Sequence, residues 1–202
     1  SVQSWTLRSF FGRATRRLPA SAVGRPPRAR SPLAVAPRDG AAQSELRIGH
    51  LSVGRGTPDY HALLVMNAVL GSQFVSRVNL KLREEKGYTY GARTGFDWRR
   101  GATPFALQAS VHTASTAEAV RDSLAELEAI RGGRPVTDQE LSLARAGLTK
   151  GYARNFETAQ QVTRSVAQLA LYRLADTYFA EFVPKVNGIT AGDVTRVAGQ
   201  YL

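Results

Sequence analysis

Between residues 88 and 112 the sequence alternates between two classes of residue, and this alternation limits the possible folds more than any other segment. Every second residue over 88–98 is mainly aromatic or apolar, and the intervening residues are small or charged. After a turn at residues 99–101, residues 105–112 alternate in the same way. Because successive side chains of a strand point to opposite faces of a sheet, the pattern predicts a β-hairpin with one buried face.

One further strand and two helices are predicted before the hairpin, and only helices after it. The strand covers residues 45–53, and the helices cover residues 57–71 and 74–85, where apolar residues recur every three or four positions. Since strands and helices are segregated along the chain, we expect an α+β fold whose mostly antiparallel sheet is backed by helices on one face.

Residues that can cap helices mark where the later helices begin. Ser115 and Thr137 each stand three residues before a glutamate, which is the spacing of a capping box. The helix from Thr137 is predicted to continue to about Asn155. Two further helices are predicted to start at Thr158 and Thr190, with a short helix between them. The helix from Thr158 carries Val162, Val166 and Leu169 at helical spacing.

The net charge of +11 is concentrated near the N-terminus. Residues 1–40 contain eight arginines and one acid, whereas residues 41–202 contain 19 basic and 15 acidic residues. Prolines and glycines are frequent in the first segment, so we predict an Arg- and Pro-rich, largely disordered arm or interdomain linker over residues 1–42 and one domain over residues 43–202. A transit peptide has a similar composition. Because the chain begins with Ser1, we expect a fragment of a longer product.

The residues that most often perform catalysis are scarce in this chain. It contains no cysteine, and its three histidines, at positions 50, 61 and 112, show neither the H-E-x-x-H nor the H-x-x-E-H spacing of zinc peptidases. We therefore expect no metal or other cofactor to be bound by this chain alone. We also expect no membrane span, because no run of 18 apolar residues occurs.

One dense segment, residues 71–91, carries side chains that can act on a substrate. It puts Arg83 near the end of a predicted helix, and Tyr88 and Tyr90 on one face of the following strand. A guanidinium and a phenol both donate hydrogen bonds, so such a pair can hold a carbonyl oxygen or stabilise an oxyanion. The same spacing is compatible with structural roles, in which Arg83 pairs with a carboxylate and the tyrosines belong to the core.

Residues 43–202 resemble the C-terminal domain of the M16 metallopeptidases, the family of pitrilysin, insulinase and mitochondrial processing peptidase. The resemblance rests on three matches: QSELRIGH from Gln43, the pattern G-x-x-F-x-S-R-x-x-x-x-L-R-E-x-K-G-Y-x-Y-G over residues 71–91, and NFETAQQ from Asn155. It implies one M16-type α+β domain. In this family, two halves of two domains each close around a peptide, and an H-x-x-E-H domain of the active half holds the zinc ion.

The resemblance also implies a role for two residues of this chain. The far half of such a peptidase contributes an arginine and a tyrosine, seven residues apart, that hold the substrate backbone. Here these residues are Arg83 and Tyr90, with Tyr88 as the fallback. The chain lacks the zinc motif, so its implied function is that of a substrate-clamping domain. Peptide hydrolysis then requires a partner domain or chain that carries H-x-x-E-H and zinc.

Two alternatives remain beside this interpretation. The first is a non-catalytic M16-like subunit of a larger complex, in which both Arg83 and Tyr90 are dispensable. The second is nucleic-acid binding by the basic arm, which would depend strongly on salt. The partners that we expect are a peptide and an H-x-x-E-H chain, and not a nucleic acid. Resemblance to bacterial members allows a cytoplasmic or a periplasmic location, and the sequence does not distinguish them.

Overall fold

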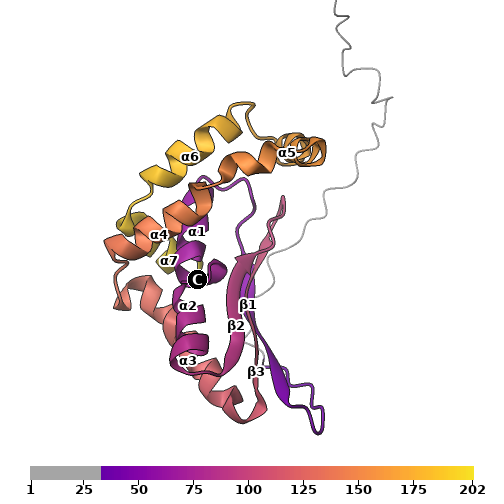
Figure 1. Cartoon of the computed structure of the whole chain (residues 1–202), viewed down its shortest axis with the longest axis vertical. Coiled ribbons are helices and arrows are strands. Elements are labelled where there is room, and N and C mark those ends of the chain that lie inside the picture. The colour runs from indigo at the N-terminus through magenta and orange to yellow at the C-terminus, as the bar shows by residue number, and fades with distance from the viewer. Residues whose placement is uncertain (1–32) are drawn as a thin grey trace, which may run out of the picture. The chain divides into compact units, whose positions relative to one another are not determined.

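The sheet of this domain consists of three antiparallel strands in a computed structural model that describes residues 33–202 (Figure 1). The strands β1 (Gln43–Ser52) and β2 (Thr89–Phe96) both pair with the central β3 (Thr103–His112). Residues of β3 alternate between buried and more exposed along the strand, which confirms the predicted hairpin of β2 and β3 with one buried face. One compact unit comprises residues 36–202. The predicted arm lies, up to residue 32, outside the described residues.

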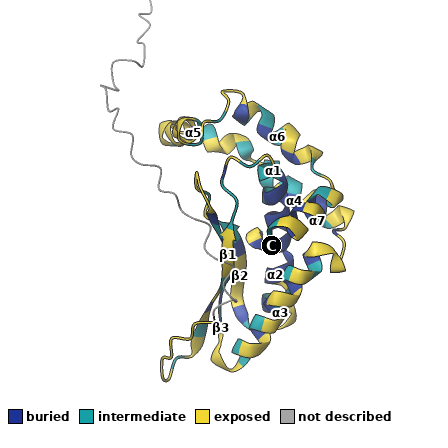
Figure 2. Cartoon of the chain, turned by 180° about the vertical axis from the view of Figure 1, so that it is seen from behind, coloured by how far each residue is buried: buried dark blue, intermediate teal, exposed yellow. Residues whose placement is uncertain are grey.

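Helices cover one face of the sheet and leave the other face open (Figures 1 and 2). They are α1 (Tyr60–Asn67), α2 (Arg77–Asn79), α3 (Thr116–Glu128), α4 (Asp138–Thr149), α5 (Ala159–Tyr172), α6 (Tyr178–Gly188) and α7 (Ala191–Tyr201). Wider π-helical turns extend α1 to Ser72, α2 to Glu85 and α3 to Gly133. This is the predicted α+β fold, an antiparallel sheet backed by helices. Among residues 33–202, none of the helices combines the length and the hydrophobicity that a membrane span requires.

The core is centred on α1, whose residues are apolar on nearly every side. Leu63, Val65 and Met66 of this helix are fully buried, and α1 contacts α4, α6 and α7. A helix that is apolar all round must be surrounded by other elements, which explains its central position. Leu107 and Val111 of β3 are also fully buried in this core.

Side-chain caps confirm three of the four predicted helix starts. Thr137, Thr158 and Thr190 each accept a hydrogen bond from the backbone N–H three residues later, and the side chain of that later residue completes a capping box. The capping box predicted at Ser115 is wrong. A 3-10 turn precedes α3, and the Thr116 hydroxyl donates to the carbonyl three residues before it instead.

The helix predicted to continue to about Asn155 ends earlier, at Thr149. Gly151 follows with a left-handed φ of 82°, a conformation that ends a helix, and a 3-10 turn occupies Tyr152–Phe156. After this break the chain changes direction, and α5 lies beyond one end of the sheet (Figure 1).

The apolar side of α5 is only partly buried. Val162 is 42% and Val166 is 58% exposed, whereas Leu169 packs against the edge of the core. Near the end of the helix, the Tyr172 hydroxyl donates to the carbonyl of Trp98 at 3.0 Å. The C-terminal part of α5 is thus anchored to the rest of the domain.

Candidate functional site

The segment 71–91 forms a helix–strand unit that carries both predicted site residues. Arg83 lies on the helical stretch Leu80–Glu85 that continues α2, and Tyr90 lies on β2. Gly71 allows α1 and β2 to approach closely, because a Cβ at this position would lie 2.7 Å from the backbone nitrogen of Thr94. The Thr94 hydroxyl donates to the side-chain oxygen of buried Asn67 at 2.7 Å. Close packing at Gly71 and the buried hydrogen bond between Thr94 and Asn67 therefore fix the position of β2 against α1.

Asn79 ties the two ends of this unit together. Its Nδ2 donates to the carbonyl of Phe74 at 2.7 Å, and its Oδ1 accepts a hydrogen bond from the N–H of Ala92 at 3.0 Å. The residue is only 4% exposed, so its amide is a buried group with both a donor and an acceptor satisfied. Sequence reasoning missed Asn79. In the sequence this residue is distinguished only as a polar residue directly after the apolar Val78, which the structure buries.

A β-bulge at the start of β2 turns Tyr90 outward. From Thr89 to Ala92, β2 advances three residues while β3 advances two, which is the geometry of a bulge. The Thr89 hydroxyl accepts a hydrogen bond from the N–H of Gly91 at 3.1 Å and so stabilises the bulge. The bulge places Tyr90 away from the buried face that carries Ala92. The prediction that Tyr88 and Tyr90 share one strand face is wrong, because β2 begins only at Thr89 and Tyr88 precedes it. Tyr88 packs partly against the core, whereas Tyr90 is 83% exposed.

Arg83 projects from its helix beside an exposed aromatic ring. Its Cζ lies 4.5 Å from the ring centroid of Phe74, which is a cation–π contact, and Phe74 itself is 61% exposed. Its Nε lies 3.4 Å from the carboxylate of Glu84. Among the described residues no hydrogen bond joins Arg83 to Tyr90. Asn79 connects the two residues indirectly. It binds the carbonyl of Phe74, whose ring contacts Arg83, and the N–H of Ala92, next to the bulge that carries Tyr90.

Arg77 belongs to the same sequence motif but is a structural residue. Its side chain is 3% exposed and donates to both carboxylate oxygens of Glu140, at 2.6 and 2.8 Å. It also donates to the carbonyls of Arg134 and Pro135, at 2.9 and 3.0 Å. The hydrogen bonds from Arg77 lower the pKa of Glu140 to about 2. These bonds occupy most of the guanidinium, which therefore joins α2 to the start of α4 rather than to a ligand.

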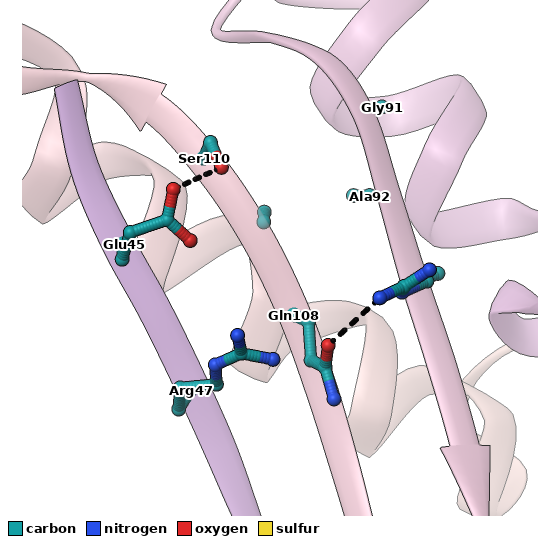
Figure 3. A pocket seen from close by; sticks show the side chains of 8 residues that line it. Glu45, Arg47, Gly91, Ala92, Gln108 and Ser110 are labelled. Atoms are coloured by element: carbon teal, nitrogen blue, oxygen red, sulfur yellow. Dashed lines mark hydrogen bonds between the residues drawn. The ribbon is translucent and has the colours of Figure 1, made fainter.

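Beside the bulge, the open face of the sheet holds a shallow polar depression of about 350 Å³ (Figure 3). Arg93 donates to the side-chain oxygen of Gln108 at 3.2 Å, and Ser110 donates to the carboxylate of Glu45. Figure 3 shows the Arg47 guanidinium directed toward Gln108 from the neighbouring strand. Sequence reasoning did not single out these residues. All three strands contribute to the lining, which consists of Glu45, Arg47, Gly91, Ala92, Arg93, Gln108, Ala109 and Ser110.

The histidines of the described part of the chain have no arrangement suited to a metal ion. In this part, no three His, Asp or Glu side chains form a group that could hold a metal. His61 packs against the rings of Tyr178 and Phe182, at centroid distances of 5.9 and 5.7 Å. Burial, followed by the charges of Lys185 and Arg55, lowers the pKa of His61 to about 4. His61 is therefore neutral at pH 7 and belongs to the packing of the helices.

Solved structures share this fold at low sequence identity. The peptidase M16 inactive domain of Pseudomonas fluorescens matches with a TM-score of 0.74 at 21% identity, over 80% of this chain and 39% of that chain. An inactive peptidase domain from Bordetella parapertussis matches with a TM-score of 0.64 at 18% identity, over 80% and 88%. Complex III2 from Candida albicans contains a chain that matches with a TM-score of 0.68 at 16% identity, over 81% and 41%. This chain thus spans about two fifths of the length of the Pseudomonas and Candida chains.

Family membership rests on the sequence, because structural likeness at these identities shows the fold alone. No curated protein matches the chain. The family described as the peptidase M16 inactive domain matches residues 6–148, which is more than half of the 202 residues. This match begins inside the segment predicted to be an arm, so the domain boundary at residue 42 stays a prediction. The chain belongs to the peptidase M16 inactive domain family.

Proposed function

We propose that this domain holds a peptide for an M16-type zinc metallopeptidase whose H-x-x-E-H motif lies in a partner domain or chain. The observation that carries the proposal is the presence of two hydrogen-bond donors, Arg83 and Tyr90, on one unit braced by Asn79. Tyr90 is 83% exposed, and the side chain of Arg83 is 35% exposed. Both groups can therefore reach a ligand. The exposure of Tyr90 favours it over the fallback residue Tyr88.

The two side chains suit the carbonyl oxygen of a peptide bond. A guanidinium and a phenol both donate to such an oxygen, and neither needs to change its charge to do so. When the carbonyl carbon is attacked, negative charge develops on the oxygen, and donors that are already oriented stabilise this charge. Zinc in the partner would supply the activated water. The contribution of this chain is to bind and orient the peptide, and the bonds of Asn79 restrict the backbone beside Tyr90.

The test is peptide cleavage by this chain expressed together with an H-x-x-E-H chain from the same genome. Chelator-sensitive cleavage is expected, and Tyr90→Phe, which removes only the hydroxyl, is expected to lower kcat/KM by roughly a hundredfold. Arg83→Gln is expected to have a similar effect. Tyr88→Phe is the matched control for the first variant, and Arg121→Gln, at an exposed position on α3, is the control for the second.

Three outcomes separate the assignments once circular dichroism shows that the variants are folded. Loss of cleavage in Tyr90→Phe with normal cleavage in Tyr88→Phe supports the proposed pair. The opposite result would assign the role to the fallback residue Tyr88. Unchanged kcat/KM in both Tyr90→Phe and Arg83→Gln would contradict a role for either proposed donor.

A non-catalytic subunit of a larger complex is the second candidate function. It is favoured by the likeness to a chain of complex III2 from Candida albicans, with a TM-score of 0.68. This function predicts a stable assembly that forms equally well with Arg83→Gln and Tyr90→Phe, and that shows no chelator-sensitive cleavage. Purification of the tagged chain from its native cells, followed by mass spectrometry, distinguishes such an assembly from a pair with an H-x-x-E-H peptidase.

A further inference from the structure

The open face of the sheet presents a row of polar side chains that crosses all three strands of the described residues. Gln108 of β3 lies opposite Arg47 of β1 and also opposite Arg93 of β2. Neighbouring strands lie about 4.8 Å apart, so the backbones of the two arginines are about 10 Å apart. All three side chains line the depression of Figure 3, on the face that the helices of Figure 2 leave open.

Charges in this depression are not balanced. Arg93 donates to the uncharged side chain of Gln108, and no ion pair among the described residues joins Arg47 or Arg93 to a carboxylate. Glu45, the one acid of the lining, accepts a hydrogen bond from Ser110 instead. Two guanidinium groups and one carboxylate leave an excess of positive charge, which attracts an anion.

The chemistry of the lining selects a carboxylate within a peptide. A guanidinium binds a carboxylate through paired N–H···O bonds, and Gln108 adds an amide donor between the two arginines. The volume of about 350 Å³ is at the small end of ligand sites. The lining contains no aromatic ring on which a nucleic-acid base could stack, and Glu45 would repel a polyanion. An extended peptide with an acidic side chain fits these features better than a nucleic acid.

The depression also adjoins Tyr90, since Gly91 follows Tyr90 directly and lines it. Arg47, Gln108 and Arg93 together form what we call the arginine row. An extended chain advances about 3.3 Å per residue, so a peptide held at Tyr90 reaches this row within about three residues. We infer that this depression is a subsite for an Asp or Glu side chain of an extended peptide. Its placement about three residues from the held peptide bond rests on the proposed function, whereas the preference for a carboxylate rests on the depression itself.

The test compares two short peptides that differ in one central residue, Glu or Gln, and that are acetylated and amidated at their ends. Binding to the full chain is measured by NMR titration at low salt, with the backbone N–H signals of Gly91 and Ala109, which line the depression and remain in every variant, as reporters. The Glu peptide is expected to bind about five- to tenfold more tightly, and added salt should reduce this difference. The double variant R47Q/R93Q is expected to lose the preference. The control R121Q/R164Q removes the same charge at exposed positions on α3 and α5 and should retain it.

The outcomes distinguish the acidic subsite from the proposed function. Equal binding of both peptides overturns the acidic subsite and leaves the proposed function standing. A preference that survives in R47Q/R93Q also overturns the subsite, as does binding that requires a free C-terminal carboxylate. Weaker binding of both peptides to Tyr90→Phe, with the Glu preference retained, supports both proposals. Binding of neither peptide contradicts both.

Discussion

The two faces of the sheet come from the same strands but carry different kinds of residue. On the face that the helices cover, β3 contributes Leu107 and Val111, which are fully buried. On the open face the same strand contributes Gln108 and Ser110, which line a polar depression (Figures 2 and 3). Because side chains alternate along a strand, a step of one residue moves from the core to the surface. We therefore expect substitutions on the helix side to change stability, and substitutions on the open side to change binding.

The largest loss of stability is expected for Arg77→Ala on the helix side. This change leaves the carboxylate of Glu140 and two backbone carbonyls without their partner, in a site where the arginine side chain is 3% exposed. Breaking a buried ion pair costs about 3–5 kcal/mol, and the loss is expected at the lower end of this range because the Glu140 side chain is 30% exposed and keeps its hydrogen bonds from Thr137. Urea denaturation measures the free energy of unfolding. Arg83→Ala, at the more exposed arginine of the same motif, is the control and should change it by less than about 0.5 kcal/mol. Equal losses in the two variants would contradict the structural role of Arg77.

A smaller loss is expected for Gly71→Ala, where the helices approach β2. The added Cβ would lie 2.7 Å from the Thr94 backbone nitrogen, so either the helix or the strand must move. Such overpacking costs about 1–3 kcal/mol. Gly95→Ala is the matched control, because no atom lies within 4 Å of the Cβ that it would add. If both variants unfold at the same urea concentration, the close contact between helix and strand is not needed.

A dependence on pH is expected from His61, which also lies on the helix side. Its pKa is lowered from 6.5 to about 4 in the folded domain, so between these values the unfolded chain binds more protons. The free energy of unfolding should therefore fall as the pH is lowered from 6.5 to 4. Glu140, with a pKa lowered from 4.5 to about 2, contributes a further loss mainly below pH 4.5, at the lower edge of this window. Urea denaturation at several pH values should show that His61→Asn has a flatter dependence between pH 6.5 and 4. An unchanged slope would contradict the burial of a neutral imidazole.

The smallest change of stability is expected for R47Q/R93Q on the open side. Neither side chain forms an ion pair within the described residues, and both are exposed. Surface substitutions of this kind change the free energy of unfolding by less than about 0.5 kcal/mol. A loss as large as that of Arg77→Ala would show that the open side also holds the fold together, and would remove the contrast between the two faces.

Several features of the fold could be predicted because their signals are local. The hairpin follows from the alternation of residue classes, and the capping boxes at Thr137, Thr158 and Thr190 depend on pairs of residues three positions apart. The box at Ser115 has the same spacing but is absent, because a 3-10 turn before α3 sets the conformation of the chain at this position. A local signal is thus overridden where the preceding element dictates the backbone.

The candidate site could be predicted only in part. The motif places Arg83 and Tyr90 correctly on a helix and on the following strand. It does not reveal the bulge that turns Tyr90 away from the buried face on which Ala92 lies. This bulge is next to the bond from Ala92 to Asn79, which joins residues 13 positions apart. Periodicity within one strand contains no information about such a bond.

By itself, the sequence determined the order of helices and strands, the capping threonines and the similarity to M16 domains, because each of these depends on residues close together along the chain. Only the tertiary structure decided which arginine of the motif is buried and which is available to a ligand. Arg77 is buried because Glu140, 63 positions away, meets it in the folded domain. The arginine row likewise exists only because β1 and β2 pair with opposite edges of β3. Contacts between distant segments form when the chain packs, and for this reason their partners are not encoded in any local pattern.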